Sequence, residues 1–380
     1  MKIKSILRGA AGVLALALAG VSPAETGVGE SSIVVGQSVP LSGGSSELGS
    51  DMKLGIQLYF DYVNSQGGVN GRKLELKTVD DGYEPDRTAA NTRQLIGKDG
   101  VFSLIGYVGT ATSLAALQVS TPAKVPFVGA FSGADALRNP FNRYVFNVRA
   151  SYAEECDRIV EQFTSLNVRR IAVVYQNDEF GRSVLSGIEK AVAKRSGQLV
   201  GSAPVERNTV NVAGAARTLA AAQPDMVIMA LTYKAGAAFV NAIRAEGAAP
   251  QFYSGSFVGA HALARELGTK GAGVGISQVV PFPWSPTASV VREYQKLLAK
   301  NDAQAEPSYV SLEGFITAKI FVEGLKRAGK DLNRDRFISA LEGIRNFDAG
   351  GYTVNFTPND HNGSKFVELT VLGRNGKFIR

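Results

Sequence analysis

Cysteine and histidine are scarce in this chain, which has one cysteine and two histidines among 380 residues. A single cysteine excludes an internal disulfide framework and any metal cluster built from several thiolates. Cys156 falls in an expected helix, where a lone thiol usually packs as a small apolar side chain. Neither His261 nor His361 stands at a metal-ligand spacing or beside a nucleophile motif. We therefore expect no metal and no cofactor.

The motifs that carry nucleotide binding or hydrolysis are missing too. The sequence contains no G-x-S-x-G, no Walker A motif and no G-x-G-x-x-G. The run from Gly271 to Gly275 fails the dinucleotide spacing and precedes an expected strand. Adjacent Asp80 and Asp81 end a strand, and neighbouring side chains on a strand point to opposite faces, so a shared role in one reaction is disfavoured. We expect that the protein is not an enzyme.

Positive charge is only mildly in excess, with a formal net charge of +7. Because lysine and arginine form no clusters interleaved with aromatic residues, we expect no nucleic-acid partner. The content of 45% hydrophobic and 20% charged residues is typical of a soluble globular protein. A chain of this length exceeds one ordinary core, which favours two domains.

Long apolar runs are also absent after the N-terminus. A basic start is followed by the apolar stretch Ala10–Val21 and by Ser22-Pro23-Ala24, the order found in a secretory signal peptide. The stretch is short for a membrane span of about 20 residues, and no cysteine near it could carry a lipid. We expect residues 1–24 to be removed, leaving a protein free outside the cytoplasm.

What the sequence does have is a repeated alternation of strands and helices. In the expected helix 51–65, for example, Met52, Ile56, Tyr59 and Val63 fall on one face. This alternation predicts an α/β fold with parallel sheets covered by helices. The expected strands are 33–39, 73–79, 101–105, 126–128, 171–175, 198–203, 226–231 and 252–254, together with a short extended run at 144–148 and a strand between Gly275 and Pro281. The expected helices are 51–65, 85–96, 111–123, 151–166, 180–194, 212–222, 234–246, 287–300, 308–328 and 335–344, followed by a terminal hairpin of 352–356 and 365–372.

Residues 101–135 contain two neighbouring strands that both end in small polar residues. The first is followed by Gly109 and Thr110 at the start of a helix, and the second by Ser132 and Gly133. Ligands bind at the carboxyl edge of open α/β sheets, and free N–H groups at a helix start favour an anion. Thr110 could equally be a plain helix cap. The two turns together favour a binding site for a charged group.

Several stretches resemble the leucine/isoleucine/valine-binding protein family, which consists of periplasmic substrate-binding proteins of ABC importers. The similarity runs through LSGGSSELGSDMKLGIQLYFDYVNSQGGVNGRKLELKTVDD, LIGYVGTATSLAAL, VVYQNDEFGRS and VREYQ. It covers essentially the whole chain after the signal peptide.

The resemblance implies a type I periplasmic binding protein fold, with two doubly wound parallel-sheet lobes joined by three crossover segments. Lobe one would comprise residues 32–147 and 281–351, and lobe two residues 148–280 and 352–380. The third crossover would fall near 351–356. The protein would be a periplasmic monomer that captures a small-molecule solute and delivers it to the permease subunits of an ABC transporter. A ligand-sensing regulator of the amide-responsive type, with the same fold, is the alternative.

The resemblance also places the ligand site. On lobe one its contacts fall on Leu48, Thr110, Phe131, Ser132 and Gly133, with Tyr107 in the same turn as Thr110. On lobe two the ring that covers the ligand falls on Phe180, and a further contact falls on Thr232 or Tyr233. Phe282 borders the cleft at the second crossover. Tyr152 and Arg149 are candidates by their location after the first crossover.

Ser256 departs from the pattern of the amino-acid-binding members, which place an acidic residue in this loop against the ligand's ammonium group. A buried ammonium group without an anionic partner is costly. Either another carboxylate, such as that of Glu47, reaches the site, or the ligand is not a free amino acid. Leu48 and Phe180 would form an apolar wall. The sequence thus allows a hydrophobic amino acid or an aromatic or aliphatic carboxylate.

Overall fold

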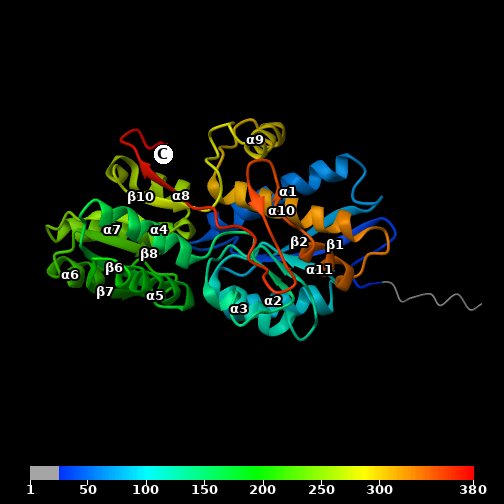
Figure 1. The fold of residues 1–380 in the computed structure, drawn as a ribbon, viewed down its shortest axis with the longest axis horizontal. Helices are drawn as coiled ribbons and strands as arrows, with labels where there is room; N and C mark the ends of the chain where they lie inside the picture. Colours follow the sequence, from blue (N-terminus) through cyan, green and yellow to red (C-terminus); the bar gives the residue numbers. More distant parts are fainter. Residues whose placement is uncertain (1–24) are drawn as a thin grey trace, which may run out of the picture.

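The computed structural model describes residues 25–380, so the expected signal peptide lies outside the described residues. Within this range the chain forms two α/β lobes that lie next to each other along the long axis of the molecule (Figure 1). The strands are β1 Ser32–Val39, β2 Lys73–Asp80, β3 Ser103–Ile105, β4 Phe127–Val128, β5 Val145–Phe146, β6 Arg170–Gln176, β7 Gln198–Val205, β8 Met226–Ala230, β9 Gln251–Ser254, β10 Gly275–Gln278, β11 Phe347–Asp348, β12 Thr353–Val354, β13 Glu368–Leu372 and β14 Phe378–Ile379. The helices are α1 Ser46–Ser65, α2 Pro85–Gly97, α3 Thr110–Ser120, α4 Tyr152–Ser165, α5 Glu179–Ala193, α6 Ala213–Ala221, α7 Tyr233–Ala245, α8 Ala260–Leu267, α9 Ser289–Asn301, α10 Tyr309–Ala328 and α11 Arg334–Glu342.

Lobe one is built on a parallel sheet with the strand order β2-β1-β3-β4-β5. Helices α1 and α10 pack against each other on one face, and α2 and α3 pack together on the other. Glycines allow the close approach of α1 to α10. A Cβ atom added to Gly55 would lie 1.8 Å from the carbonyl oxygen of Ser311, and one added to Gly314 would lie 2.4 Å from that of Met52. A late segment of the chain therefore completes the core of the lobe that the first strand begins.

Lobe two has the strand order β14-β13-β10-β9-β8-β6-β7. The neighbouring strands β7, β6, β8, β9 and β10 are parallel to one another, whereas β13 runs antiparallel to β10 and β14 antiparallel to β13. Helices α4 and α5 form one packed pair, and α6, α7 and α8 form a second group. The α/β fold with parallel sheets predicted from the alternation is confirmed.

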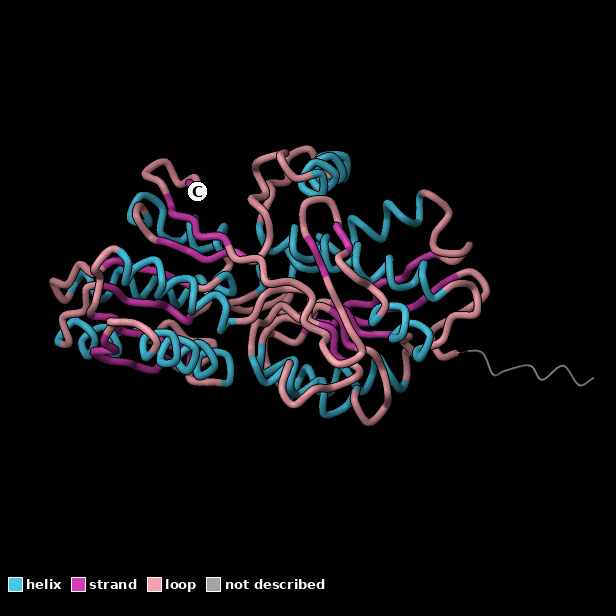
Figure 2. Tube along the Cα trace, viewed as in Figure 1, coloured by secondary structure: helices cyan, strands magenta, loops and turns pink. Residues whose placement is uncertain are grey.

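Within residues 25–380, three connections pass between the two sheets, and they lie together in the middle of the molecule (Figure 2). They link β5 to α4, β10 to α9, and β12 to β13. The first and third run beside each other, because the Asn147 N–H donates to the His361 carbonyl at 2.9 Å and the Gly363 N–H donates to the Asn147 carbonyl at 2.7 Å. The hinge region therefore consists of several paired segments and not of one free linker.

The structure differs from the sequence prediction in one helix, in the short strands β11 and β14, and in the pairing of the two C-terminal runs. Helix α8 was not predicted, because its eight residues fill a short stretch bounded by Gly259 and Gly268 that gives little periodic signal. The expected terminal hairpin was wrong: β12 pairs with β11, and β13 pairs with β10 and β14. The two extended runs were correctly placed along the chain but belong to different sheets.

Candidate functional site

The candidate site lies where the carboxyl ends of the two sheets face each other. In lobe one the strands β1, β3 and β4 end here. The segments that follow them carry Leu48 in the first turn of α1, Thr110 at the start of α3, and Phe131. In lobe two the segments after β6 and β9 carry Phe180 and Phe257. The centroids of the Phe131 and Phe257 rings, one from each lobe, are 5.2 Å apart. The two lobes are therefore in direct contact at this edge.

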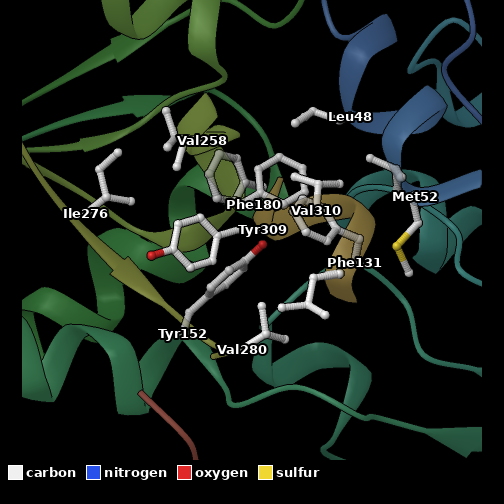
Figure 3. Close-up of a cluster of buried hydrophobic side chains, with 14 of the residues drawn as sticks. Leu48, Met52, Phe131, Tyr152, Phe180, Val258, Ile276, Val280, Tyr309 and Val310 are labelled. Atoms are coloured by element: carbon white, nitrogen blue, oxygen red, sulfur yellow. The ribbon is translucent and has the colours of Figure 1, made fainter. Parts of the chain in front are cut away.

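Aromatic rings from both lobes form the centre of this contact. We call Phe131, Tyr152, Phe180 and Phe257 the interlobe cluster. The ring centroids of Tyr152 and Phe180 are 5.5 Å apart, and those of Phe180 and Phe257 are 4.5 Å apart. All four side chains are at most 2% exposed. Around them Figure 3 shows Leu48 and Met52 from α1 and Val310 from the start of α10.

A pair of hydroxyl groups lies next to the rings on lobe one. The oxygens of Thr110 and Ser132 are 2.8 Å apart, and both residues are fully buried. Thr110 begins α3 directly after Gly109, whose φ of +102° suits glycine. A Cβ atom added at Gly109 would lie 2.6 Å from the ring of Tyr83. The tight turn thus brings the start of α3 to the edge of the cluster.

The turn at Gly133 packs directly on the first residue of α4. A Cβ atom at Gly133 would lie 2.6 Å from the Tyr152 ring, and the Tyr152 N–H donates to the Gly133 carbonyl at 2.7 Å. Burial raises the pKa of the Tyr152 hydroxyl to about 12, although the charge of Arg149 and the neighbouring Ser132 act in the opposite direction. Tyr152 is therefore protonated at neutral pH and can donate a hydrogen bond.

A buried group of charged residues lies beside the cluster. Nη2 of Arg149 is 3.1 Å from Glu155 and Nη1 is 3.4 Å from Glu313. Glu155 also accepts hydrogen bonds from the Ser256 N–H at 2.8 Å, from the Ser256 hydroxyl at 3.0 Å and from the Ser277 hydroxyl. Arg149 contacts the Ser256 hydroxyl as well. We call Arg149, Glu155 and Glu313 the buried ionic group.

The pKa values of Glu313 and Arg149 in the buried ionic group are shifted from their ordinary values. Burial raises the pKa of Glu313 to about 7, and the nearby Arg149 only partly opposes that increase. For Arg149 burial lowers the pKa, but the two glutamates outweigh it and leave the pKa above its usual value. The guanidinium carbon lies 4.9 Å from the centre of the Phe131 ring and 5.8 Å from that of Tyr152. A permanent positive charge therefore borders the aromatic rings.

The buried ionic group also connects the lobes. Arg149 belongs to the first connection, Glu155 to α4 of lobe two, and Glu313 to α10 of lobe one. Further contacts bridge the rim of the cleft, where Glu47 pairs with Arg265. Two cavities of about 690 and 650 Å³ open at this rim, and both are bordered by His261, Arg265 and Glu306. The contact between the lobes is therefore closed at the interlobe cluster, and the two cavities lie at its rim.

Most of the residues selected from the sequence come together here. Ser256, Tyr152 and Phe180 approach lobe one from lobe two. Tyr233 follows Thr232 at the start of α7 and lies beside Gly259, which also contacts Leu48. The residues that meet at the facing edges are Leu48, Thr110, Phe131, Ser132, Gly133, Tyr152, Phe180, Tyr233 and Ser256, with Thr232 adjacent.

Tyr107 and Phe282 are not brought to the interlobe cluster. The side chain of Tyr107 lies on the opposite face of the sheet, where its ring packs on Phe127 at 5.0 Å and its hydroxyl is 3.2 Å from that of Thr92. Side chains alternate between faces along an extended chain, and Tyr107 takes the α2/α3 side. Phe282 packs with Trp284, at 5.2 Å between ring centroids, and borders the 690 Å³ cavity.

The sequence did not indicate Phe257, Glu155 or Glu313. Glu155 and Ser256 are 101 residues apart in the chain, and Glu313 belongs to a helix of the other lobe. In the part of the chain that the structure describes, no group of histidine, cysteine, aspartate or glutamate side chains is arranged to hold a metal ion. Every helix in residues 25–380 is too short or too polar to serve as a bilayer span.

Comparison with known proteins agrees with this architecture. A family described as periplasmic binding protein matches residues 32–377. The Leu/Ile/Val-binding protein homolog 7 of Brucella suis biovar 1 (strain 1330) is 24% identical over 387 residues, covering 96% of this chain and 94% of that protein.

Two solved structures share both the fold and about a third of the sequence. One is a possible leucine/isoleucine/valine-binding protein from Rhodopirellula baltica SH 1, with 33% identity and a TM-score of 0.87, covering 95% of this chain and 98% of that one. The other is a substrate-binding periplasmic protein from Ralstonia solanacearum, with 33% identity and a TM-score of 0.86, covering 91% of this chain and 99% of that one.

Proposed function

Because the chain belongs to the periplasmic binding protein family, we propose that it is the solute-binding component of an ABC importer. It would capture a small organic solute between its lobes in the periplasm and present the closed form to the permease subunits. It would do so as a monomer, without catalysis. Ligands shift such two-state proteins towards the conformation that they bind more tightly.

The observation that carries this proposal is the composition of the facing edges. Rings from both lobes are in contact beside a pair of hydroxyl groups, which is the arrangement expected if both lobes enclose a solute. Apolar walls with a few convergent polar groups are typical of small-molecule sites. Nothing in the cluster supplies a nucleophile paired with a base, which favours binding over turnover.

The proposal is tested by ligand-induced stabilisation of the purified protein. Hydrophobic amino acids, aromatic and aliphatic carboxylates and amides would be screened by thermal unfolding. A ligand present at about a hundred times its dissociation constant adds about 2.7 kcal/mol. The ligand should also reduce the radius of gyration in small-angle X-ray scattering if the lobes close around it.

A matched pair of variants locates the effect. Thr110→Val removes a hydroxyl from the pair and should weaken binding at least tenfold, whereas Thr218→Val, on the exposed side of α6, should not. Failure of every solute to stabilise the protein would contradict the proposed function, as would chemical conversion of a bound solute.

A further inference from the structure

Some buried donors that make no hydrogen bond lie at or beside the interlobe cluster. In the described part of the chain, Nε and Nη1 of Arg149 and the hydroxyl of Tyr152 are buried and make no hydrogen bond within the protein. Of these atoms, Nη1 is in an ion pair with Glu313 at 3.4 Å. Arg149 is 1% exposed and Tyr152 is 2% exposed. Leaving such groups unpaired is unfavourable, and more so for a charged group. A ligand that supplies acceptor oxygens would remove this cost.

The acceptors of the site, by contrast, are already in use. The two oxygens of Glu155 accept from Arg149, from both the N–H and the hydroxyl of Ser256, and from Ser277. Four hydrogen bonds saturate a carboxylate. Glu47 is held at the rim by Arg265. Neither carboxylate is therefore available for an ammonium group of a ligand.

Asp178, at the start of α5, is also in use, because its side chain accepts from the N–H groups of Phe180 and Gly181 and from Gln176. Glu313 is the other carboxylate of the buried ionic group, and it is linked to the first connection between the lobes. Its ion-pair partner is Nη1 of Arg149, and it influences the titration of Tyr352, whose hydroxyl donates to the Val148 carbonyl in the first connection. With a pKa of about 7, Glu313 can take up a proton when an anion binds beside Arg149. The charges of Arg149 and Glu155 then cancel, so the anion binds beside an ionic group that is neutral overall and that still has hydrogen-bond donors to offer.

We infer that the site takes an organic carboxylate with an aromatic or branched aliphatic remainder and without an ammonium group, with Arg149 and Tyr152 as polar partners of the carboxylate. This inference rests on the proposed function and narrows its ligand class. A guanidinium group binds a carboxylate through parallel N–H donors, and the rings of Phe131, Phe180 and Phe257 provide the apolar wall. A zwitterionic amino acid would bury its ammonium group without a free anionic partner, which is strongly unfavourable.

The test uses probes that share one apolar group and differ only in charge. The first set is 3-phenylpropanoate, 3-phenylpropanamide and L-phenylalanine, and the second is 4-methylpentanoate, 4-methylpentanamide and L-leucine. Affinities would be measured by isothermal titration calorimetry. In at least one set the carboxylate should bind at least tenfold more tightly than the amide and at least a hundredfold more tightly than the amino acid. An amino acid or amide that binds as tightly as its carboxylate partner would overturn the inference.

Variants test the role of Arg149. Removing this arginine alone would leave two buried glutamates without their cation. The double variant Arg149→Gln/Glu313→Gln is therefore preferred. It removes one positive and one negative charge, so the net charge of the buried ionic group equals that of the wild type with Glu313 ionised. Its affinity ratio between carboxylate and amide should fall to about one, while Arg158→Gln, at an exposed position, should leave the ratio as it is. A folded double variant that keeps the tenfold preference would overturn the assignment of Arg149.

The outcomes separate this inference from the proposed function. A solute with an ammonium group that binds and closes the lobes would refute the ligand class and leave the solute-binding role intact. The absence of binding by every probe and by the broader screen would refute both. If the double variant does not fold by circular dichroism, the comparison of the three probes on the wild-type protein decides the ligand class.

Discussion

Replacing Glu313 with glutamine should change how the stability of the protein depends on pH. Burial raises the pKa of this glutamate from 4.5 to about 7. Between these values the unfolded chain releases its proton while the folded protein keeps it. Folding therefore becomes less favourable as the pH rises through this window, and stability that is present below pH 4.5 is lost by about pH 7.

The size of the effect follows from the shift. A difference of about 2.5 pH units corresponds to about 3 kcal/mol, at about 1.4 kcal/mol per unit. Glutamine does not titrate, so the Glu313→Gln variant escapes this loss. Because part of the titration lies outside this range, the unfolding free energy of the variant relative to wild type should increase by about 2–3 kcal/mol between pH 5 and pH 8. The groups that face Glu313 are Arg149, Glu155 and Tyr352, and all of them remain in both proteins.

Urea unfolding at pH 5, 6, 7 and 8, followed by circular dichroism, measures this difference. Burial also raises the pKa of Asp51 and of Asp81 to about 6, but their contributions cancel because both proteins contain them. The same substitution at exposed Glu189 serves as the control and should show no trend. A difference that stays constant to within about 0.5 kcal/mol, against the roughly 2–3 kcal/mol expected from linkage, would refute the reasoning.

Three further predictions concern packing, reactivity and the rim of the cleft. Gly55→Ala should destabilise the protein by about 2–3 kcal/mol because its Cβ atom would collide with the α10 backbone, whereas Gly214→Ala, with open space around it, should cost nothing in urea unfolding. The thiol of Cys156, whose pKa burial raises well above the ordinary range, should react with a disulfide reagent only after unfolding, and rapid labelling of the native protein would contradict its burial. Arg265→Ala, which breaks the exposed pair with Glu47, should weaken ligand binding less than about fivefold. Surface plasmon resonance should show that most of this loss comes from faster dissociation. A loss of affinity above fiftyfold would be inconsistent with a rim contact.

The fold could be predicted because its main signals are local. The apolar face of the helix around Ile56 and the alternation of strands and helices depend only on neighbouring residues. The same holds for Thr110 and Ser132, since strand ends with small polar residues can be recognised in the sequence. Helix α8 escaped prediction because it is short. Tyr107 was selected for its place in a turn, and the face of the sheet that it occupies depends on the geometry of that turn.

The buried ionic group could not be predicted in the same way. Arg149 stood out only by its place next to the expected first crossover, and its partners come from helices of different lobes. Glu313 lies inside a helix whose sequence is otherwise that of a packed core segment. Their meeting depends on how the lobes close, and no local pattern encodes that arrangement. For the same reason Ser256 looked like a missing charge, although the structure shows its hydroxyl in contact with Arg149 and Glu155.

The interleaving of the two lobes along the chain affects how the protein reaches its native state. Helix α10 covers α1 although more than 240 residues separate their first turns, and β13 joins the edge of β10 some 90 residues later. Contacts this distant must overcome the entropy of closing large loops, which slows folding. The segment before residue 148 lacks α10 and so does not contain the complete core of lobe one, whereas residues 148–380 contain every element of lobe two. A cut at residue 147 therefore does not divide the molecule into two complete lobes, and lobe one reaches its final packing only once α10 has been added.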